Sequence, residues 1–156
     1  MLIVPGSDGL RFDESLSRSE DFDLWLRILK QGGRIGYHRQ PLARYRRVRG
    51  SLSSSGTRMY RQGLAVLDKV ARTMTLTPRE REGLERTSAR FRAMLRLEEG
   101  KEALARNDTP AAIDGLREAN EFFRSGKLRL ALLLLRVAPR ALRLIYGTRR
   151  RADAKV

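Results

Sequence analysis

The sequence predicts a short α/β piece over residues 1–49 followed by a mainly α-helical tail, so the chain is expected to be mostly helical overall. Two observations predict this division. Residues 1–49 combine one segment of helical apolar spacing with short extended runs, whereas the pattern stays helical almost to the end beyond residue 57. A Ser/Gly-rich linker at residues 50–56 separates the two parts, which makes residues 57–156 the tail.

Two stretches of the α/β piece are expected to be extended. Residues 2–4 are a short apolar run, typical of the end of a strand. Residues 34–48 alternate imperfectly between apolar and polar side chains, with a break near Pro41.

A helix is expected between these stretches, over residues 20–31. Ser19 is a favoured N-cap residue, and Gly32 with Gly33 is a favoured helix end. Apolar residues at helical spacing predict one apolar face that packs into a core, and the tryptophan is expected to be part of it. These residues are Phe22, Trp25, Leu26 and Leu29. Leu24 and Ile28 add a second apolar stripe, so this helix is expected to be covered on more than one side.

The tail is expected to contain helices over residues 57–74, 78–106, 109–124 and 127–147. Thr77 and Glu80 have the spacing of a capping box, and the run Asn107-Asp108-Thr109-Pro110 ends one helix and begins another. Pro139 interrupts the last helix. The two helices around Asn107 resemble one tetratricopeptide-like hairpin, with small residues where they would meet: Gly100, Ala103, Ala111, Ala112 and Ala119.

The chain is strongly basic, with 33 Lys and Arg against 18 Asp and Glu, a net charge of +15. The excess lies in residues 26–72 (twelve basic, one acidic) and 124–156 (ten basic, one acidic). Such blocks favour anionic partners, although an Arg-rich sequence with solvated arginines explains them equally well. Cysteine is absent, which excludes disulfides and zinc–thiolate sites. The longest apolar run, residues 130–135, is far too short for a membrane span, so a cytoplasmic location is expected, with the inner face of the membrane as an open option.

One segment carries a recognisable order of motifs. Phe12-Asp13-Glu14-Ser15-Leu16 is followed by Glu20-Asp21-Phe22-Asp23-Leu24-Trp25-Leu26-Arg27, a helix that ends in glycine, then Pro41-Leu42-Ala43-Arg44-Tyr45-Arg46 and a Ser-rich stretch. This order resembles the acceptor-side end of family-two glycosyltransferases, which have the Rossmann-like GT-A fold. The resemblance covers residues 11–55, and it departs from many members in having Val48 where they have histidine.

The resemblance implies an inverting enzyme that transfers a sugar from a nucleotide-sugar donor to a hydroxyl acceptor, of the cell-surface polysaccharide or glycolipid type. It implies that Asp21 is the general base, that Glu20, Asp23 and Asp13 support the acceptor or the site, and that Arg46 lies near the donor diphosphate. From the acids alone, ordinary first-turn carboxylates explain the same residues.

The nucleotide-binding half of the family precedes the matched segment, so we expect this half to be missing or to be a separate chain. The 156 residues alone are then expected to be inactive and to bind no cofactor, whereas Mn²⁺ or Mg²⁺ is expected in the complete enzyme. Asp21 and Asp23 do spell D-x-D, but two residues on a helix point about 200° apart, which is unsuitable for one shared metal ion.

The competing hypothesis is a basic helical adaptor, or a nucleic-acid or membrane-surface binding protein without enzymatic activity. The charge and the helical tail favour it. The arginines are not interleaved with aromatic residues and no nucleic-acid motif is present, so no specific nucleic acid is expected. Residues 127–151 place leucines beside arginines, which suits peripheral membrane contact, although the same leucines suit packing on the preceding helices.

Overall fold

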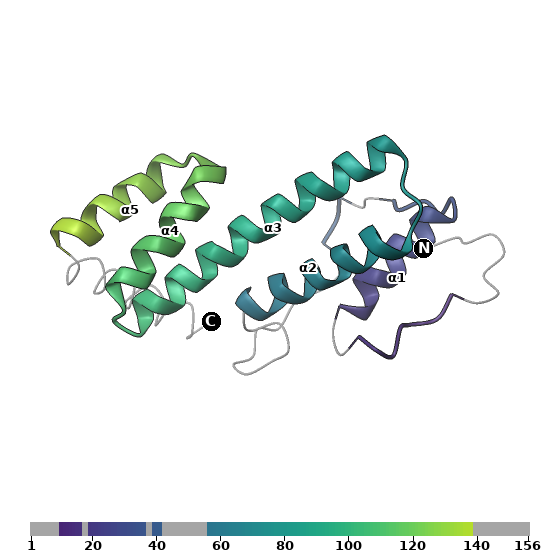
Figure 1. The fold of residues 1–156 in the computed structure, drawn as a ribbon, viewed down its shortest axis with the longest axis horizontal. Coiled ribbons are helices and arrows are strands. Elements are labelled where there is room, and N and C mark those ends of the chain that lie inside the picture. Colours follow the sequence, from purple (N-terminus) through teal and green to yellow (C-terminus); the bar gives the residue numbers. More distant parts are fainter. Residues whose placement is uncertain (1–9, 17–18, 37–38, 42–55, 139–156) are drawn as a thin grey trace. The chain divides into compact units, whose positions relative to one another are not determined.

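The structure, a computed structural model, describes residues 10–16, 19–36, 39–41 and 56–138. These residues form five helices: α1 (Glu20–Lys30), α2 (Gly56–Thr73), α3 (Pro78–Ala105), α4 (Thr109–Phe123) and α5 (Gly126–Val137) (Figure 1). The chain divides into two compact units, Met1–Leu84 and Glu85–Val156. Helix α2 therefore belongs to the same unit as α1, and the boundary between the units falls within α3.

The expected α/β piece is wrong, because the described residues contain no strand and no sheet. Residues 33–36 are irregular, and Ile35 is 55% exposed. A strand needs a neighbour to pair its backbone N–H and C=O groups and a face to bury. An isolated stretch with Gly36 and an exposed Ile35 has neither among the described residues. The other expected extended runs, at residues 2–4 and 42–48, lie outside the described residues.

Helix α1 begins at the expected residue and ends as the glycines predict, but Ser19 does not cap it through its side chain as expected. Gly32 has φ 85°, a conformation that favours glycine, and Gly33 N–H donates to the Ile28 carbonyl at 2.9 Å. Ser19 does occupy the N-cap position, but its φ is 59° and its side chain makes no capping hydrogen bond. The Ser19 carbonyl instead accepts from the Asp23 N–H at 3.1 Å, which closes the first turn.

Of the two expected apolar stripes of α1, the first unit buries Ile28 of the second stripe, whereas part of the first stripe stays exposed. Helix α1 contacts α2, and the buried apolar side chains of the pair are Ile28 of α1 and Val66, Leu67 and Val70 of α2. Trp25 and Leu29 are 46% and 41% exposed, so the predicted core position of the tryptophan is wrong.

The starts of α3 and α4 confirm the capping signals. Thr77 N–H donates to Glu80 Oε2 at 2.7 Å, and Glu80 N–H donates to Thr77 Oγ1 at 3.3 Å, which is a reciprocal capping box. Asp108 caps α4 by accepting from the Ala111 N–H at 3.1 Å, after Asn107 turns the chain at φ 65°. Helix α5 ends at Val137, two residues before Pro139, and residues 139–147 of the expected helix lie outside the described residues.

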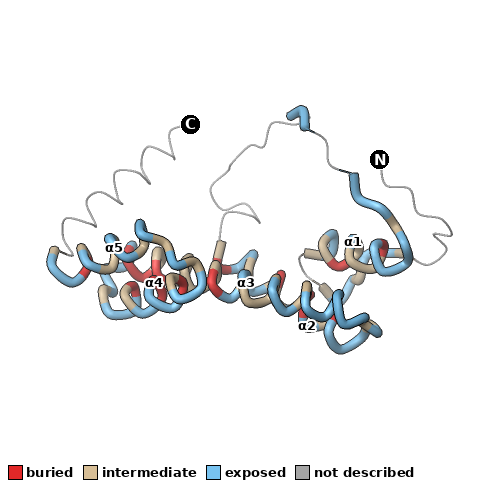
Figure 2. Tube along the Cα trace, turned by 90° about the horizontal axis from the view of Figure 1, so that it is seen from above, coloured by how far each residue is buried: buried red, intermediate tan, exposed pale blue. Residues whose placement is uncertain are grey.

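The second unit is built around a close approach of α3 and α4. A Cβ added to Gly115 would lie 2.7 Å from the Arg96 carbonyl oxygen and 2.9 Å from the Gly100 Cα, so this contact requires glycine. The buried positions of α4 appear in red in Figure 2. The core cluster joins α3, α4 and α5 and consists of Ala103, Leu104, Ala112, Leu116 and Leu135, with Leu97, Ile113, Leu128 and Leu132 packed against it.

Among the described residues, none of the helices combines the length and the apolar character needed to cross a membrane.

Candidate site at the start of helix α1

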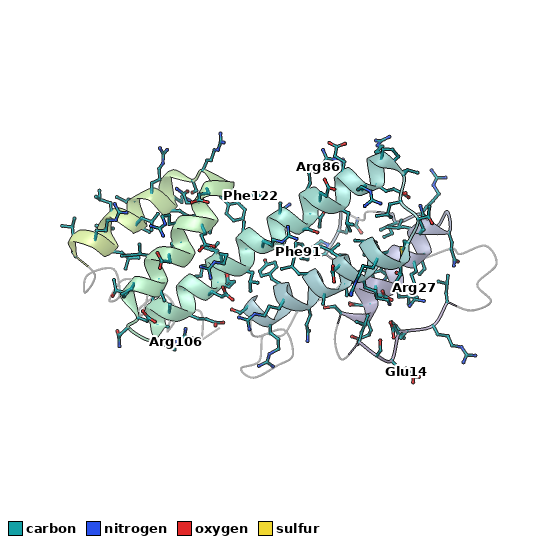
Figure 3. The ribbon with its side chains drawn as sticks, in the orientation of Figure 1. Glu14, Arg27, Arg86, Phe91, Arg106 and Phe122 are labelled. Carbon is teal, nitrogen blue, oxygen red and sulfur yellow. The ribbon has the colours of Figure 1, made fainter. Side chains whose placement is uncertain are left out.

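Asp23 lies at the centre of an ion-pair network in the first unit. Its side chain is 0% exposed, Oδ1 accepts from Lys69 Nζ at 2.7 Å, and Oδ2 accepts from Arg27 Nε at 2.9 Å. A buried carboxylate is tolerated when both oxygens are paired in this way. Arg27, labelled in Figure 3, reaches Asp23 along one turn of α1, whereas Lys69 comes from α2.

The same network holds the loop that precedes α1. Lys69 Nζ also donates to Asp13 Oδ2 at 2.6 Å, and Arg27 Nη2 donates to the Arg11 carbonyl at 2.5 Å. We call Asp13, Asp23, Arg27 and Lys69 the Lys69 network. It connects residues 11–13, α1 and α2, and so fixes the chain on both sides of the Glu20-Asp21 pair.

Two groups of the Lys69 network have shifted pKa values. The hydrogen bond from Lys69, followed by those from the Ser15 hydroxyl and N–H, holds the pKa of Asp13 well below its usual range. Desolvation lowers the pKa of Lys69, but the hydrogen bonds to Asp13 and Asp23 together outweigh it, and the net shift is upward. Both shifts favour the charged forms, so Lys69 and Asp13 form an ion pair at neutral pH.

Asp21 and Glu20 stand apart from the network. Both are exposed in the first turn of α1, and Asp21 Oδ1 accepts from the Phe22 N–H at 2.7 Å. The first-turn acids are therefore divided: Asp23 is buried and neutralised by cations, and Asp21 is open to solvent.

This division bears on metal binding. Asp21 is exposed and Asp23 is buried with both oxygens on cations, so the pair does not fit a shared divalent ion. The described residues contain no group of three or more His, Asp or Glu side chains that could hold a metal.

The remaining candidate residues add little to the site. Arg46 lies outside the described residues, so its expected position near a diphosphate stays a prediction. Glu14, next to Asp13, is exposed and extends outward (Figure 3). A shallow hollow of about 320 Å³ belongs to the second unit and is lined by residues that the sequence did not single out: Asn120, Glu121, Arg124 and Arg129.

Sequence reasoning missed the two cations of the network. Arg27 was detectable, because it follows Asp23 at i, i+4, a spacing at which opposite charges meet on a helix. Lys69 lies 46 residues from Asp23 in the sequence, so no local spacing predicts their contact. The one indication is that Lys69 lies about one helical turn from Val66, which is buried.

No protein-family model, no curated protein and no solved structure matches this chain. The interpretation of the site therefore depends on its residues and their geometry alone.

Proposed function

We propose that the chain supplies the catalytic-base segment of an inverting nucleotide-sugar glycosyltransferase, with Asp21 as the general base. The observation that carries the proposal is the separation of the acids, within the motif that resembles this family. Asp21 is exposed while Asp13 and Asp23 are held by Lys69. A general base has to be reachable by the acceptor and ionised, and its position has to be fixed.

The Lys69 network supports the requirement that the position of the general base is fixed. Asp21 lies between Ser19, whose carbonyl closes the first turn of α1, and Asp23, which is anchored to α2. Asp13 and Asp23 are assigned to positioning this turn, and Glu20 to the exposed surface beside it. None of the three is assigned a proton-transfer role.

The proposed reaction follows from a carboxylate at this place. Asp21 takes the proton of the acceptor hydroxyl while the hydroxyl oxygen forms a bond to the anomeric carbon of the sugar. The bond from that carbon to the diphosphate oxygen breaks, its electron pair leaves with the nucleoside diphosphate, and the configuration inverts. The acceptor is a hydroxyl of the polysaccharide or glycolipid type.

Donor binding is assigned to a nucleotide-binding half outside the matched residues, together with Mn²⁺ or Mg²⁺, which would balance the diphosphate charge. We propose that this half covers part of the apolar surface that the described residues of the first unit expose. The side chains concerned are between 41% and 58% exposed: Phe12, Trp25, Leu29, Ile35 and Met59.

The proposal is tested by Asp21→Asn in the complete enzyme, meaning this chain together with the nucleotide-binding half. Asparagine keeps the size of the side chain and a hydrogen-bonding oxygen but cannot take the proton. We expect turnover to fall about a hundredfold to ten-thousandfold with the donor KM nearly unchanged, measured as release of nucleoside diphosphate.

Glu20→Gln is the matched control, because it removes the same charge from the neighbouring exposed position. It should lower turnover by less than about tenfold. Wild-type turnover in Asp21→Asn, or a complete enzyme that transfers from none of the UDP-, GDP- and TDP-sugars, would overturn the proposal.

A further inference from the structure

Helix α5 has an apolar face that the core of its unit does not explain. Leu130 and Leu133 are each 57% exposed and Val137 is 76% exposed. At 100° per residue these three positions fall within a sector of about 60°, so they form one line, which we call the α5 stripe.

The opposite side of α5 is the side that packs. Leu135 is 1% exposed in the core cluster, and Leu128 and Leu132 pack against that cluster. The α5 stripe therefore points away from the core, and α5 is apolar on two sides, only one of which the second unit covers among the described residues.

Basic side chains border the α5 stripe on both sides. Arg129 and Arg136 lie along one edge and Lys127 along the other, and all three are exposed. Acidic residues are absent from 124–137, and residues 124–156 as a whole contain ten basic residues and one acid.

We propose that α5 binds the surface of an anionic phospholipid membrane, with the α5 stripe at the boundary of the acyl chains. Arg129, Arg136 and Lys127 would then lie beside the stripe at the level of the headgroups, where their long apolar stems permit the charges to stay in water. This arrangement uses both features of the helix, its apolar line and its basic edges.

Two other partners for the α5 stripe, a second copy of the chain and a nucleic acid, fit its charges and apolar side chains less well. A second copy docked through the same stripe would bring like basic edges together, which is unfavourable. A nucleic acid would pair with the basic edges but would leave the leucines of the stripe without an apolar partner. An anionic lipid surface meets the charges and the apolar stripe at once, and this function is independent of sugar transfer.

The test is sedimentation of the full chain with vesicles of phosphatidylcholine alone and of phosphatidylcholine with 30% phosphatidylserine. We expect binding to the anionic vesicles and at least tenfold weaker binding to the neutral ones, since each basic residue near an anionic surface contributes about fivefold.

Two pairs of variants separate the stripe from the charge. Leu130→Ser with Leu133→Ser should weaken binding to anionic vesicles about tenfold or more. Met59→Ser, which alters a 46% exposed apolar residue of the other unit, should leave this binding unchanged.

The second pair tests the charges. Arg129→Gln with Arg136→Gln should weaken binding to anionic vesicles at least tenfold. Arg79→Gln with Arg81→Gln removes the same charge at exposed positions of α3 and should change this binding by less than about threefold.

A fluorescent probe reports directly on the stripe. Leu133→Trp in a Trp25→Phe background places the only tryptophan on α5. Its emission should shift to the blue with anionic vesicles and be quenched by lipids brominated on the acyl chains.

Several results would overturn the proposal. The leucine variant binding vesicles as well as wild type would reduce the effect to general cation attraction. A dimer that this variant converts to monomer would assign the stripe to a second copy. A loss of thermal stability in this variant, with vesicle binding unchanged, would assign it to the chain's own C-terminal residues. An equal loss of DNA binding and of vesicle binding in this leucine variant, whose charge is unchanged, would contradict a lipid-specific role of the stripe.

Discussion

The burial and the ion pairs of Asp23 could be predicted only in part from the sequence. In the sequence it is one of three acids in a first turn, and only the Arg27 that follows it at i, i+4 separates it from Asp21. In the structure its side chain is fully buried and paired with Lys69 and Arg27. The pair with Arg27 follows from local spacing, but the pair with Lys69 depends on how α2 packs on α1, which no local pattern specifies.

The first prediction concerns the stability contributed by Asp23. Asp23→Asn replaces a carboxylate by a group that would present an NH₂ donor to the Lys69 or Arg27 donors, and leaves both cations without their shared anion. We expect a loss of about 2–4 kcal/mol in the free energy of unfolding, because the buried anion is removed and the two cations keep only Asp13 and the Arg11 carbonyl as partners. Urea unfolding followed by Trp25 fluorescence measures this in the first unit.

Asp68→Asn is the matched control for this prediction. Asp68 pairs with Arg72 one turn along α2 at 2.9 Å, but the two side chains are 64% and 72% exposed. Its loss should cost less than about 0.5 kcal/mol. Equal effects of the two substitutions would mean that the burial of Asp23 contributes nothing.

Helix ends could be predicted from the sequence, because local contacts specify them, whereas strands could not, because they depend on a partner strand. Thr77 with Glu80, Asp108 and Gly32 each specify a helix end through a local hydrogen bond or a special φ, and all were placed correctly from sequence. The strand predictions relied on partial alternation, which acquires meaning only when a neighbouring strand exists, and they failed at Ile35. The exposed side of α1 was also misjudged, because apolar spacing shows that a face exists but not whether anything covers it.

The second prediction addresses the contact of α3 with α4. Gly115→Ala would push a Cβ into backbone atoms of α3, at 2.7 Å from the Arg96 oxygen, so the helices must separate. We expect a loss of about 1–3 kcal/mol in the free energy of unfolding, followed by circular dichroism.

Gly83→Ala, in α3, is the matched control and should raise the free energy of unfolding. A Cβ at Gly83 meets no atom within 4 Å, and alanine is the better helix former, which gives a gain of up to about 1 kcal/mol. A Gly115→Ala protein as stable as wild type would mean that the glycine contact is not required.

The third prediction concerns pH and the start of α3. Lys30 Nζ donates to Glu80 at 2.7 and 2.9 Å, and this pair, followed by the hydrogen bonds with Thr77, lowers the pKa of Glu80 from 4.5 to about 2. A lowered pKa stabilises the folded state above the unfolded value of 4.5, and this stabilisation is lost as the pH falls toward 2. Between pH 5 and 2 the Tm of wild type should therefore fall more steeply than that of Glu80→Gln.

Glu85→Gln serves as the control for the pH experiment, because it removes an exposed carboxylate from the same helix outside the capping box. Its Tm should follow wild type across the whole range. Parallel curves for wild type and Glu80→Gln would show that the Lys30 pair makes no contribution.

At the scale of the whole chain, the net charge of +15 and the acceptor-side motif point to two different partners. The charge attracts any polyanion, so retention on DNA or heparin at low salt carries no functional information. Charge alone was readable from the sequence. The combination of basic side chains with an exposed apolar stripe on α5 could not be predicted, because only the packing shows that Leu130 and Leu133 stay exposed between the basic edges.

The last prediction is that the 156-residue chain by itself neither binds a nucleotide sugar tightly nor transfers one. The resemblance covers residues 11–55, an acceptor-side segment, and the described residues hold no group of side chains suited to a divalent ion. Calorimetry with UDP-, GDP- and TDP-sugars and Mn²⁺ should therefore give no micromolar binding. Pyrophosphate is the control, because attraction of a cationic chain to a diphosphate would be equal for both ligands and would disappear between 0.15 and about 0.5 M salt. Micromolar binding that favours one nucleotide sugar over pyrophosphate and survives high salt would place the donor site in this chain, and the assignment to an acceptor-side segment would then be wrong.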